Sequence, residues 1–400
     1  MKRLDEVRRL TGRTVWLDRP GVGAELVLDD TDEPAAVLAG LQAAVHIGFA
    51  AWGVDVGPLL GRMHRAGISL AMAAPDDVLH TAADALETLV RRVLGLAPTD
   101  DEQAALDERD NDAWRAAFAQ ESSPALLALL SAAPTVHVPV LHGDDAVTIG
   151  LGVHSRTYPL TSLPSPTEVP WEDLGRIPVA LVTGTNGKTT TTRLLARMGE
   201  EAGHQCGYTT TDGLVIAGEE VSDGDWSGPG GARSVLRDER VQFAVLETAR
   251  GGMLRRGLAL TEADVAIITN VSADHLGEYG IYDAPEMAAV KCLVAKGLRA
   301  GGSLVLNGDD DVLMGAASQL PNSRVLFSRR GQGEALASHL AWGGEAWTLE
   351  NDVLVHRQGP TRRTPWLPVA ELPMTFQGTA GFNVENLMAA TAAAVCLGLP

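Results

Sequence analysis

The residues with the clearest chemical potential form a glycine turn that is followed at once by a lysine and two threonines. Glycine lets a backbone curl so that several N–H groups face one point, and a helix that starts there adds partial positive charge. Lys188 can then reach the terminal phosphates of a nucleotide, and the Thr189 hydroxyl can ligate Mg²⁺. The pattern predicts a nucleotide phosphate loop made of Gly184, Thr185, Asn186, Gly187, Lys188, Thr189 and Thr190.

Two elements should position this loop. An apolar run at 179–182 predicts a buried strand before it, and a helical run to about residue 202 follows, with Gly203 placed to end the helix. The spacing departs from the common eight-residue loop, because position 182 is valine where that pattern has glycine. A plain glycine turn with an incidental lysine is the alternative, but the order of strand, glycines, lysine, threonine and helix favours phosphate binding.

Polar candidates follow two further apolar runs. Glu247 ends the run at 243–246, and Asn270, Asp274 and His275 follow the run at 265–268. The carboxyl ends of strands are where α/β sheets bind ligands. A solvated glutamate and ordinary loop hydrogen bonds are the alternatives.

The remaining candidates lie on expected helices and turns. Lys291 lies in a helix expected over 284–296, where an ordinary surface lysine is the alternative. Asn383 and Asn386 share one helix face, although Asn383 could instead cap that helix. An ordinary turn is expected at 307–310.

Three arginines surround a Gly-Gly pair. Arg250, Arg255 and Arg256 flank Gly251 and Gly252. Guanidinium groups bind carboxylates through two parallel hydrogen bonds, and glycines permit close approach of a ligand. This segment predicts a site for a substrate carboxylate, with Arg250 and Arg255 as its ligands, and surface salt bridges are the alternative.

The elements divide the chain into three parts. Residues 175–400 alternate short apolar runs with helical segments, which predicts an α/β fold with a doubly wound, mostly parallel sheet and a smaller β element at 346–366. Residues 1–134 read as a mainly helical domain without a chemical constellation, and its histidines read as surface or core residues. Residues 135–174 read as a β-hairpin followed by a linker rich in Pro and Ser.

Composition narrows the function. With 32 basic and 51 acidic residues the net charge is −19, which disfavours nucleic-acid binding but permits a locally held nucleotide. No run of about 18 consecutive apolar residues occurs, so no membrane span is expected. Three distant cysteines fit neither a disulfide framework nor a zinc site, and a cytoplasmic protein is the simplest expectation.

Several motifs together resemble the Mur ligase family. They are, in order, TGTNGKTT at 183–190, FAVLE at 243–247, ITNVSADH at 268–275, Lys291 and GFNVEN at 381–386. The stretches LETARGGMLRRG at 246–257, GYTTTDG at 207–213 and ADHLG at 273–277 are similar to cyanophycin synthetases. The resemblance covers roughly residues 175–400, and the amino-terminal region is too short for the ATP-grasp module that precedes the Mur-like module in those enzymes.

The resemblance implies an ATP-dependent ligase that activates a carboxylate as an acyl phosphate and couples it to an amine. It implies ATP and Mg²⁺ as cofactors, with Thr189 and Glu247 on one metal ion and His275 on a second. Lys188, His275 and Lys291 would be catalytic, Lys291 after carbamylation, and Asn270, Asn383 and Asn386 would lie against the nucleotide. The substrates would be small amino acids or peptides, and a homo-oligomer is an open possibility.

Two other functions stay open: a Mur-type ligase for a cell-wall or folate-like acceptor, and a non-catalytic nucleotide-binding or scaffold protein. Mur ligases also have a carboxyl-terminal domain that completes the nucleotide and amine sites, and we expect none within these residues. The chain is then a fragment, or is completed by another chain, or binds ATP without ligation. We favour a fragment that binds Mg²⁺–ATP but turns over poorly.

Overall fold

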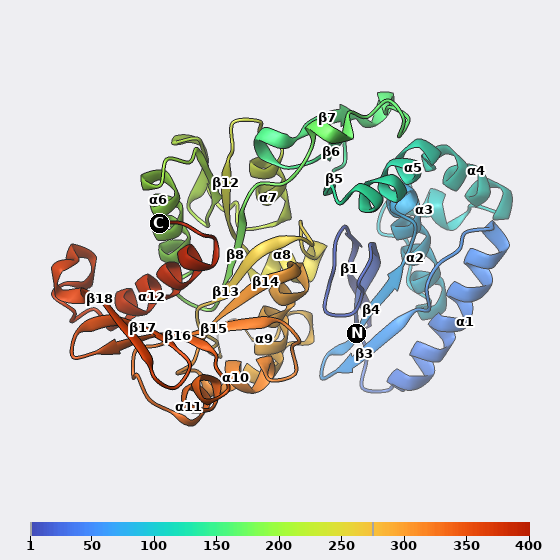
Figure 1. The fold of residues 1–400 in the computed structure, drawn as a ribbon. Helices are drawn as coiled ribbons and strands as arrows, with labels where there is room; N and C mark the ends of the chain where they lie inside the picture. Colours follow the sequence, from blue (N-terminus) through green and yellow to red (C-terminus); the bar gives the residue numbers. More distant parts are fainter. Residues whose placement is uncertain (1, 274–275) are drawn as a thin grey trace.

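The computed structural model describes residues 2–273 and 276–400 of the chain (Figure 1). Residues up to about 134 form an amino-terminal domain, residues from 179 onward form a central domain, and a small sheet lies between them in the sequence. Asp274 and His275 lie outside the described residues.

One large sheet organises the central domain. Among the described residues it has eleven strands in the order β11-β10-β9-β12-β8-β13-β14-β15-β16-β17-β18. Neighbours from β9 to β16 in this order run parallel, and antiparallel strands extend both edges. The strands are β8 (Val179–Thr183), β9 (Cys206–Thr209), β10 (Gly213–Ile216), β11 (Glu219–Asp223), β12 (Phe243–Glu247), β13 (Ala263–Ile268), β14 (Leu298–Asn307), β15 (Ser323–Ser328), β16 (Glu345–Glu350), β17 (Val353–Gln358) and β18 (Arg362–Pro368).

Helices cover both faces of this sheet. Ala180 and Val182 of β8 pack in one apolar core with α6 and α12, and Val179 and Leu181 pack in another core with α7 to α11. Side chains of a strand alternate between the two faces of the sheet. A strand that is apolar throughout therefore needs helices packed on both faces. The helices are α6 (Lys188–Glu201), α7 (Pro229–Leu236), α8 (Arg250–Arg256), α9 (Ala284–Lys291), α10 (Asp311–Ala317), α11 (Glu334–Ala341) and α12 (Gly381–Cys396).

The doubly wound α/β fold is therefore confirmed, with two corrections of detail. The expected β element at 346–366 is the stretch β16 to β18, which continues the main sheet. The helix expected over 284–296 ends at Lys291 and continues as a 3₁₀ helix over Cys292–Gly297.

The amino-terminal domain contains a sheet that the sequence did not predict. Among the described residues its four strands run antiparallel in the order β1-β2-β4-β3, with helices packed against them. The prediction of a mainly helical domain is corrected, because β2 and β4 are rich in glycine and alanine and buried almost throughout, so they lack the period of two that marks a half-buried strand. The elements are β1 (Arg3–Leu10), β2 (Gly21–Val27), α1 (Pro34–Trp52), β3 (Leu60–His64), β4 (Gly67–Ala73), α2 (Leu79–Leu94), α3 (Asp101–Asp107), α4 (Asn111–Glu121) and α5 (Pro124–Ala132).

Helix α1 bears on the expectation that the chain has no membrane-spanning segment. By length and composition alone it could cross a membrane, although the core helix of a soluble protein passes the same test. Leu41, Val45, Phe49 and Trp52 of this helix are buried in the core of the amino-terminal domain.

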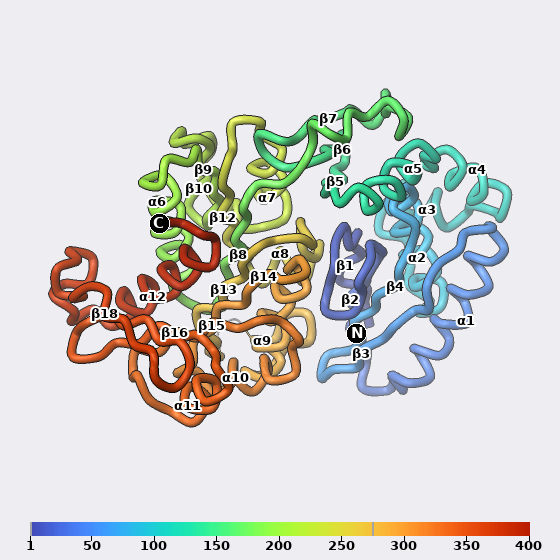
Figure 2. The backbone as a smooth tube through the Cα atoms, in the orientation of Figure 1, coloured from blue at the N-terminus to red at the C-terminus, as the bar shows by residue number. Residues whose placement is uncertain are grey.

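The segment between the domains forms a small antiparallel sheet of β5 (Val140–His142), β6 (Ala146–Ile149) and β7 (Arg156–Pro159). β5 and β6 are the expected hairpin, and β7 adds a strand to it. Figure 2 traces this segment from α5 of the amino-terminal domain to β8 of the central sheet.

Candidate active site

The turn between β8 and α6 requires glycine at two positions. Gly184 and Gly187 have φ angles of 150° and 82°, which side-chain-bearing residues rarely adopt. A Cβ atom at Gly184 would lie 1.8 Å from Thr269 Oγ1, and one at Gly187 would lie 2.1 Å from Asn386 Oδ1. The turn is thus packed between the end of β13 and the start of α12.

The residues after β13 hold the turn in its curled shape. Thr185 N donates to Asn270 O (2.9 Å), and Asn186 N donates to Asn270 Oδ1 (2.9 Å). Asn186 O in turn accepts from Asn270 Nδ2 (3.1 Å) and from Thr269 Oγ1 (2.6 Å). Asn270 therefore lies against the loop and shapes it through its described contacts, and its contact with the nucleotide stays a prediction.

Helix α6 starts at Lys188, with Gly187 as its N-cap residue. The first N–H groups of a helix have no partner within the helix and can face an anion. Lys188 Nζ donates to Thr185 O (3.1 Å), so the ammonium group folds back over the turn. Thr189 and Thr190 lie in the first turn of α6. The predicted loop residues Gly184 to Thr190 therefore form the turn after β8 and the start of this helix.

Glu247 lies beside the start of this helix, at the carboxyl end of β12. Strand β12 pairs directly with β8. Glu247 Oε2 accepts from Thr189 Oγ1 (2.8 Å) and more weakly from Thr211 N (3.4 Å). Its Oε1 is buried, lies 4.0 Å from Lys188 Nζ and accepts no hydrogen bond from the described residues. Burial raises the pKa of the Glu247 carboxyl above its ordinary value, although the Thr189 hydrogen bond and the Lys188 charge act against this shift.

This geometry suits a magnesium ion. A buried carboxylate oxygen that accepts no hydrogen bond from the described residues lies near a threonine hydroxyl, and Mg²⁺ prefers such oxygen ligands. Among the described residues no group of three or more His, Cys, Asp and Glu could hold a metal ion. Mg²⁺ does not require one, because it usually keeps several waters and binds substrate phosphates through one or two protein ligands.

Of the two predicted asparagines on α12, Asn386 packs against Gly187 of the turn and accepts a hydrogen bond from α6, whereas the described hydrogen bond of Asn383 goes elsewhere. Asn386 is buried, and its Oδ1 lies 3.5 Å from Thr191 Oγ1 and under Gly187. Asn383 Nδ2 donates to Met374 O (2.7 Å), which fixes the segment before the helix. Asn383 is not the helix cap, because Ala380 occupies that position.

The arginines around Gly251 and Gly252 are divided between two environments. Arg250 starts α8 and forms an ion pair with Glu278. Arg255 and Arg256, with both glycines, line a cavity of about 690 Å³ between the two domains. On its other side the cavity is lined by Glu6, Val7, Arg8, Arg9, His80, Ala83 and Asp84 of the amino-terminal domain.

Two predicted catalytic residues are not placed in the site. Lys291 is buried at the end of α9, and its carbamylation and catalytic role stay predictions. His275, with Asp274, lies outside the described residues. The expected turn at 307–310 is confirmed as structural, because Asn307 Oδ1 accepts from Asp309 N and Asp310 caps α10.

Comparison with known proteins identifies the family. A sequence model described as the Mur ligase middle domain matches residues 182–394, which is more than half of the chain. The chain belongs to the Mur ligase family. The match begins in β8 and ends within α12, so it contains the phosphate turn, Glu247 and Asn386, whereas one side of the interdomain cavity lies outside it.

Curated relatives support the resemblance of this Mur ligase chain to cyanophycin synthetases. The cyanophycin synthetase of Crocosphaera subtropica is 42% identical over 231 residues, covering 58% of this chain and 26% of that protein. The one from Geminocystis herdmanii is 39% identical over 277 residues, covering 66% and 32%. The UDP-N-acetylmuramoylalanine–D-glutamate ligase of Methylococcus capsulatus is 30% identical over 224 residues, covering 56% and 40%. The matches thus span about a quarter to two fifths of these relatives.

The sequence did not single out some residues of this Mur ligase site. Thr211 supports Glu247 from the loop after β9, and Thr269 closes the space under Gly184. Thr211 lies in the GYTTTDG stretch, so its only signal was the resemblance of that stretch. Arg9 and His80 line the cavity from a domain in which we expected no chemical constellation, and nothing in their spacing indicates that placement.

Proposed function

We propose that this chain contains the nucleotide-binding and carboxylate-activating part of an ATP-dependent ligase that joins a carboxylate to an amine. The observation that carries this proposal is the contact of Thr189 and Lys188 with the buried Glu247 at the tip of β12. This contact supports a metal site directly beside a glycine turn suited to phosphates. The identity to cyanophycin synthetases supports a ligase over other nucleotide-binding proteins.

The chemistry follows from the poor reactivity of a carboxylate toward amines. Transfer of the γ-phosphoryl group of ATP to a carboxylate oxygen gives an acyl phosphate and ADP. Attack of an amine on the acyl carbon then forms the amide and releases phosphate, with loss of one amine proton. Such transfer depends mainly on alignment and on stabilisation of charge.

The residues of this chain divide these tasks. The N–H groups of the turn and the Lys188 ammonium would bind the phosphates, and Thr189 and Glu247 would hold Mg²⁺. Bound Mg²⁺ would offset negative charge on the transferring group. Asn386 would fix the turn from the side of α12, where the nucleotide base is expected. Arg255, in the interdomain cavity, would bind a carboxylate of the acceptor.

Replacement of Lys188 tests the nucleotide site. A ligand at 100 times its dissociation constant stabilises a protein by about 2.7 kcal/mol, so Mg²⁺–ATP should raise the melting temperature of the wild type. Lys188→Ala should lose most of this rise and all ADP release. Arg197→Ala, on the exposed side of the same helix, is the control and should behave like the wild type. A wild type that Mg²⁺–ATP does not stabilise would contradict the proposal.

A panel of acceptors tests the substrate class. We favour an aspartate side chain or a peptide end as the carboxylate and arginine or lysine as the amine, in the cytoplasm. ADP release should require both partners, and Arg255→Ala should raise the KM for the acceptor more than the KM for ATP. The 30% identity to a UDP-N-acetylmuramoylalanine–D-glutamate ligase favours cell-wall precursors as the second class to assay, with folate-like acceptors third.

A further inference from the structure

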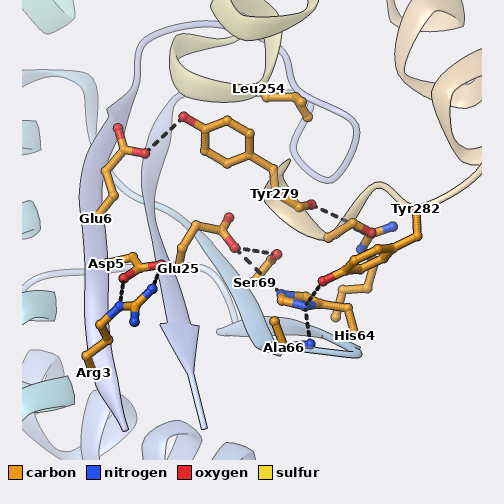
Figure 3. Close-up of polar contacts among 12 residues, drawn as sticks. Arg3, Asp5, Glu6, Glu25, His64, Ala66, Ser69, Leu254, Tyr279 and Tyr282 are labelled. Carbon is orange, nitrogen blue, oxygen red and sulfur yellow. Dashed lines mark hydrogen bonds and ion pairs between the residues drawn. The ribbon is translucent and has the colours of Figure 1, made fainter. Parts of the chain in front are cut away.

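Two strands of the amino-terminal sheet contact the connection between β13 and α9 of the central domain (Figure 3). The Tyr279 hydroxyl donates to Glu6 Oε2 of β1 (3.1 Å). The guanidinium group of Arg8, also on β1, lies over the Tyr279 ring at 4.9 Å from its centre. Arg8 Nε also donates to Leu254 O of α8 (3.2 Å), so β1 touches two elements of the central domain.

Arg62 of β3 donates hydrogen bonds to the backbone of the same connection. Its Nη2 donates to Tyr279 O (2.9 Å) and Gly280 O (2.5 Å), and its Nη1 lies 3.5 Å from Glu286 Oε1 on α9. Gly280 has a φ of 69°, and a Cβ there would lie 2.6 Å from Arg62 Nη2. The arginine therefore fits against a backbone that only glycine allows.

The backbone of Tyr279, which Arg62 contacts, has an unusual conformation. Tyr279 has φ 52° and ψ 32°, a left-handed conformation that a bulky residue keeps only when its surroundings fix it. Its carbonyl, its ring and its hydroxyl are each held by a residue of the amino-terminal domain. That domain thus supplies three of the contacts that fix Tyr279, and Arg255 of α8 contacts the same hydroxyl.

Arg8, whose guanidinium group lies over the Tyr279 ring, is itself bonded to residues of the amino-terminal sheet. Arg8 Nη2 donates to Glu25 Oε1 (2.7 Å), and Glu25 Oε2 accepts from Ser69 Oγ (2.6 Å). Next to them His64 Nδ1 accepts from Ala66 N (3.3 Å) and faces the Tyr282 hydroxyl (3.4 Å). Glu25 and Ser69 are buried, so these hydrogen bonds are shielded from water.

The same connection reaches the candidate active site at its other end. Asn270 holds the phosphate turn, and Ser272 N donates to Thr185 Oγ1 (2.9 Å). Glu278, next to Tyr279, forms the ion pair with Arg250. Residues of this connection thus contact the phosphate turn before Asp274, and contact the amino-terminal domain and Arg250 after His275.

We propose that Arg62 is a positioning residue for the ligase reaction: by fixing Tyr279 and Gly280 it aligns the phosphate turn with the acceptor-binding arginines. This inference rests on the proposed function. Arg62 makes no contact with the turn or with Glu247 in its described bonds, so it acts through the connection. The amino-terminal domain is thereby part of the catalytic unit.

The test compares Arg62→Ala with Arg115→Ala in the full chain. Arg115 is an arginine of the same domain that bonds only to Ala51 and Asp112 in its described contacts. Arg62→Ala should speed amide hydrogen exchange at 277–282 and at Thr185 and Asn186. Because small misalignments cost much rate, its kcat for amine-dependent ADP release should fall about 10- to 100-fold, with a smaller change in the KM for ATP. Arg115→Ala should match the wild type in both measurements.

The outcomes separate the two proposals. A kcat for Arg62→Ala within twofold of the wild type, or unchanged exchange at Thr185 and Asn186, would overturn the positioning role. A wild type without Mg²⁺–ATP stabilisation and without ADP release would instead refute the ligase proposal, and the exchange at Thr185 and Asn186 would still decide the role of Arg62. If Arg62→Ala does not fold, Tyr279→Phe removes the hydroxyl interactions with Glu6 and Arg255 but keeps the bonds of Arg62, and should shift exchange and kcat in the same direction by less.

Discussion

At the scale of single residues, Glu247 combines burial with a carboxylate oxygen that accepts no hydrogen bond within the described part of the chain. The raised pKa of Glu247 means that burial disfavours the charged form of its carboxyl group. A cation bound beside it would stabilise that charged form. Glu247→Gln keeps the size and the acceptor oxygen for Thr189 but removes the charge. We expect an undiminished melting temperature without nucleotide, and loss of the Mg²⁺-dependent part of the stabilisation by ATP, measured by titrating Mg²⁺ at fixed ATP.

The matched control for this change is Glu201→Gln on the exposed side of α6, which should leave the response to Mg²⁺ unchanged. If Glu247→Gln responds to Mg²⁺ as the wild type does, the assignment of Glu247 as a metal ligand is wrong.

At the scale of elements, α6 carries glycine at both ends, and the two positions differ in their surroundings. Gly187 and Gly203 both have left-handed φ angles of 82° and 91°, but a Cβ at Gly203 meets nothing within 4 Å. Gly203→Ala should therefore cost only the strain of this conformation, about 1 kcal/mol of unfolding free energy. Gly187→Ala adds a clash with Asn386 and should cost clearly more, about 2–4 kcal/mol.

Urea unfolding with and without Mg²⁺–ATP measures both effects. Only Gly187→Ala should weaken nucleotide binding, because it separates the turn from α12. Equal costs for the two variants would show that the turn and Asn386 do not pack as described.

At the scale of the whole molecule, the domains meet around buried charges. Burial alone would raise the pKa of the Glu25 carboxyl, but His64, Arg8 and Ser69 around it lower the pKa below its ordinary value. Glu25→Ala leaves Arg8 buried with only the more distant Glu6, and should cost about 3 kcal/mol of unfolding free energy. Asp112→Ala breaks an exposed pair with Arg115 and should cost less than about 1 kcal/mol.

The pH dependence gives an independent measure of the Glu25 pair. A carboxyl with a lowered pKa stabilises the fold above its unfolded pKa, and this contribution is lost as the pH falls through the folded value. Between about pH 5 and about pH 3 the wild type should therefore lose more stability than Glu25→Gln. Parallel pH profiles in thermal melts would show that Glu25 contributes no such linkage.

Much of the central domain could be predicted from the sequence, because its signals are local. Runs apolar on both faces predicted β8, β12 and β13, and the glycine–lysine–threonine order predicted the turn and the start of α6. The amino-terminal sheet could not be predicted in this way, because the glycines and alanines of β2 and β4 carry no strand period. Glu247 was predicted from its place at a strand end; the structure places it beside Thr189, and its role as a metal ligand stays a prediction.

The sequence by itself determined the residue types that can bind phosphate and metal, and the parallel sheet whose strand ends gather them. Only the tertiary structure decided which distant residues meet. Thr269 and Asn386 pack against the turn, Arg9 and His80 line the cavity, and Arg62 reaches Tyr279 across 217 positions of sequence. The physical reason is that local spacing fixes helices and strands, whereas contacts between domains depend on how whole surfaces pack, and no short pattern encodes that packing.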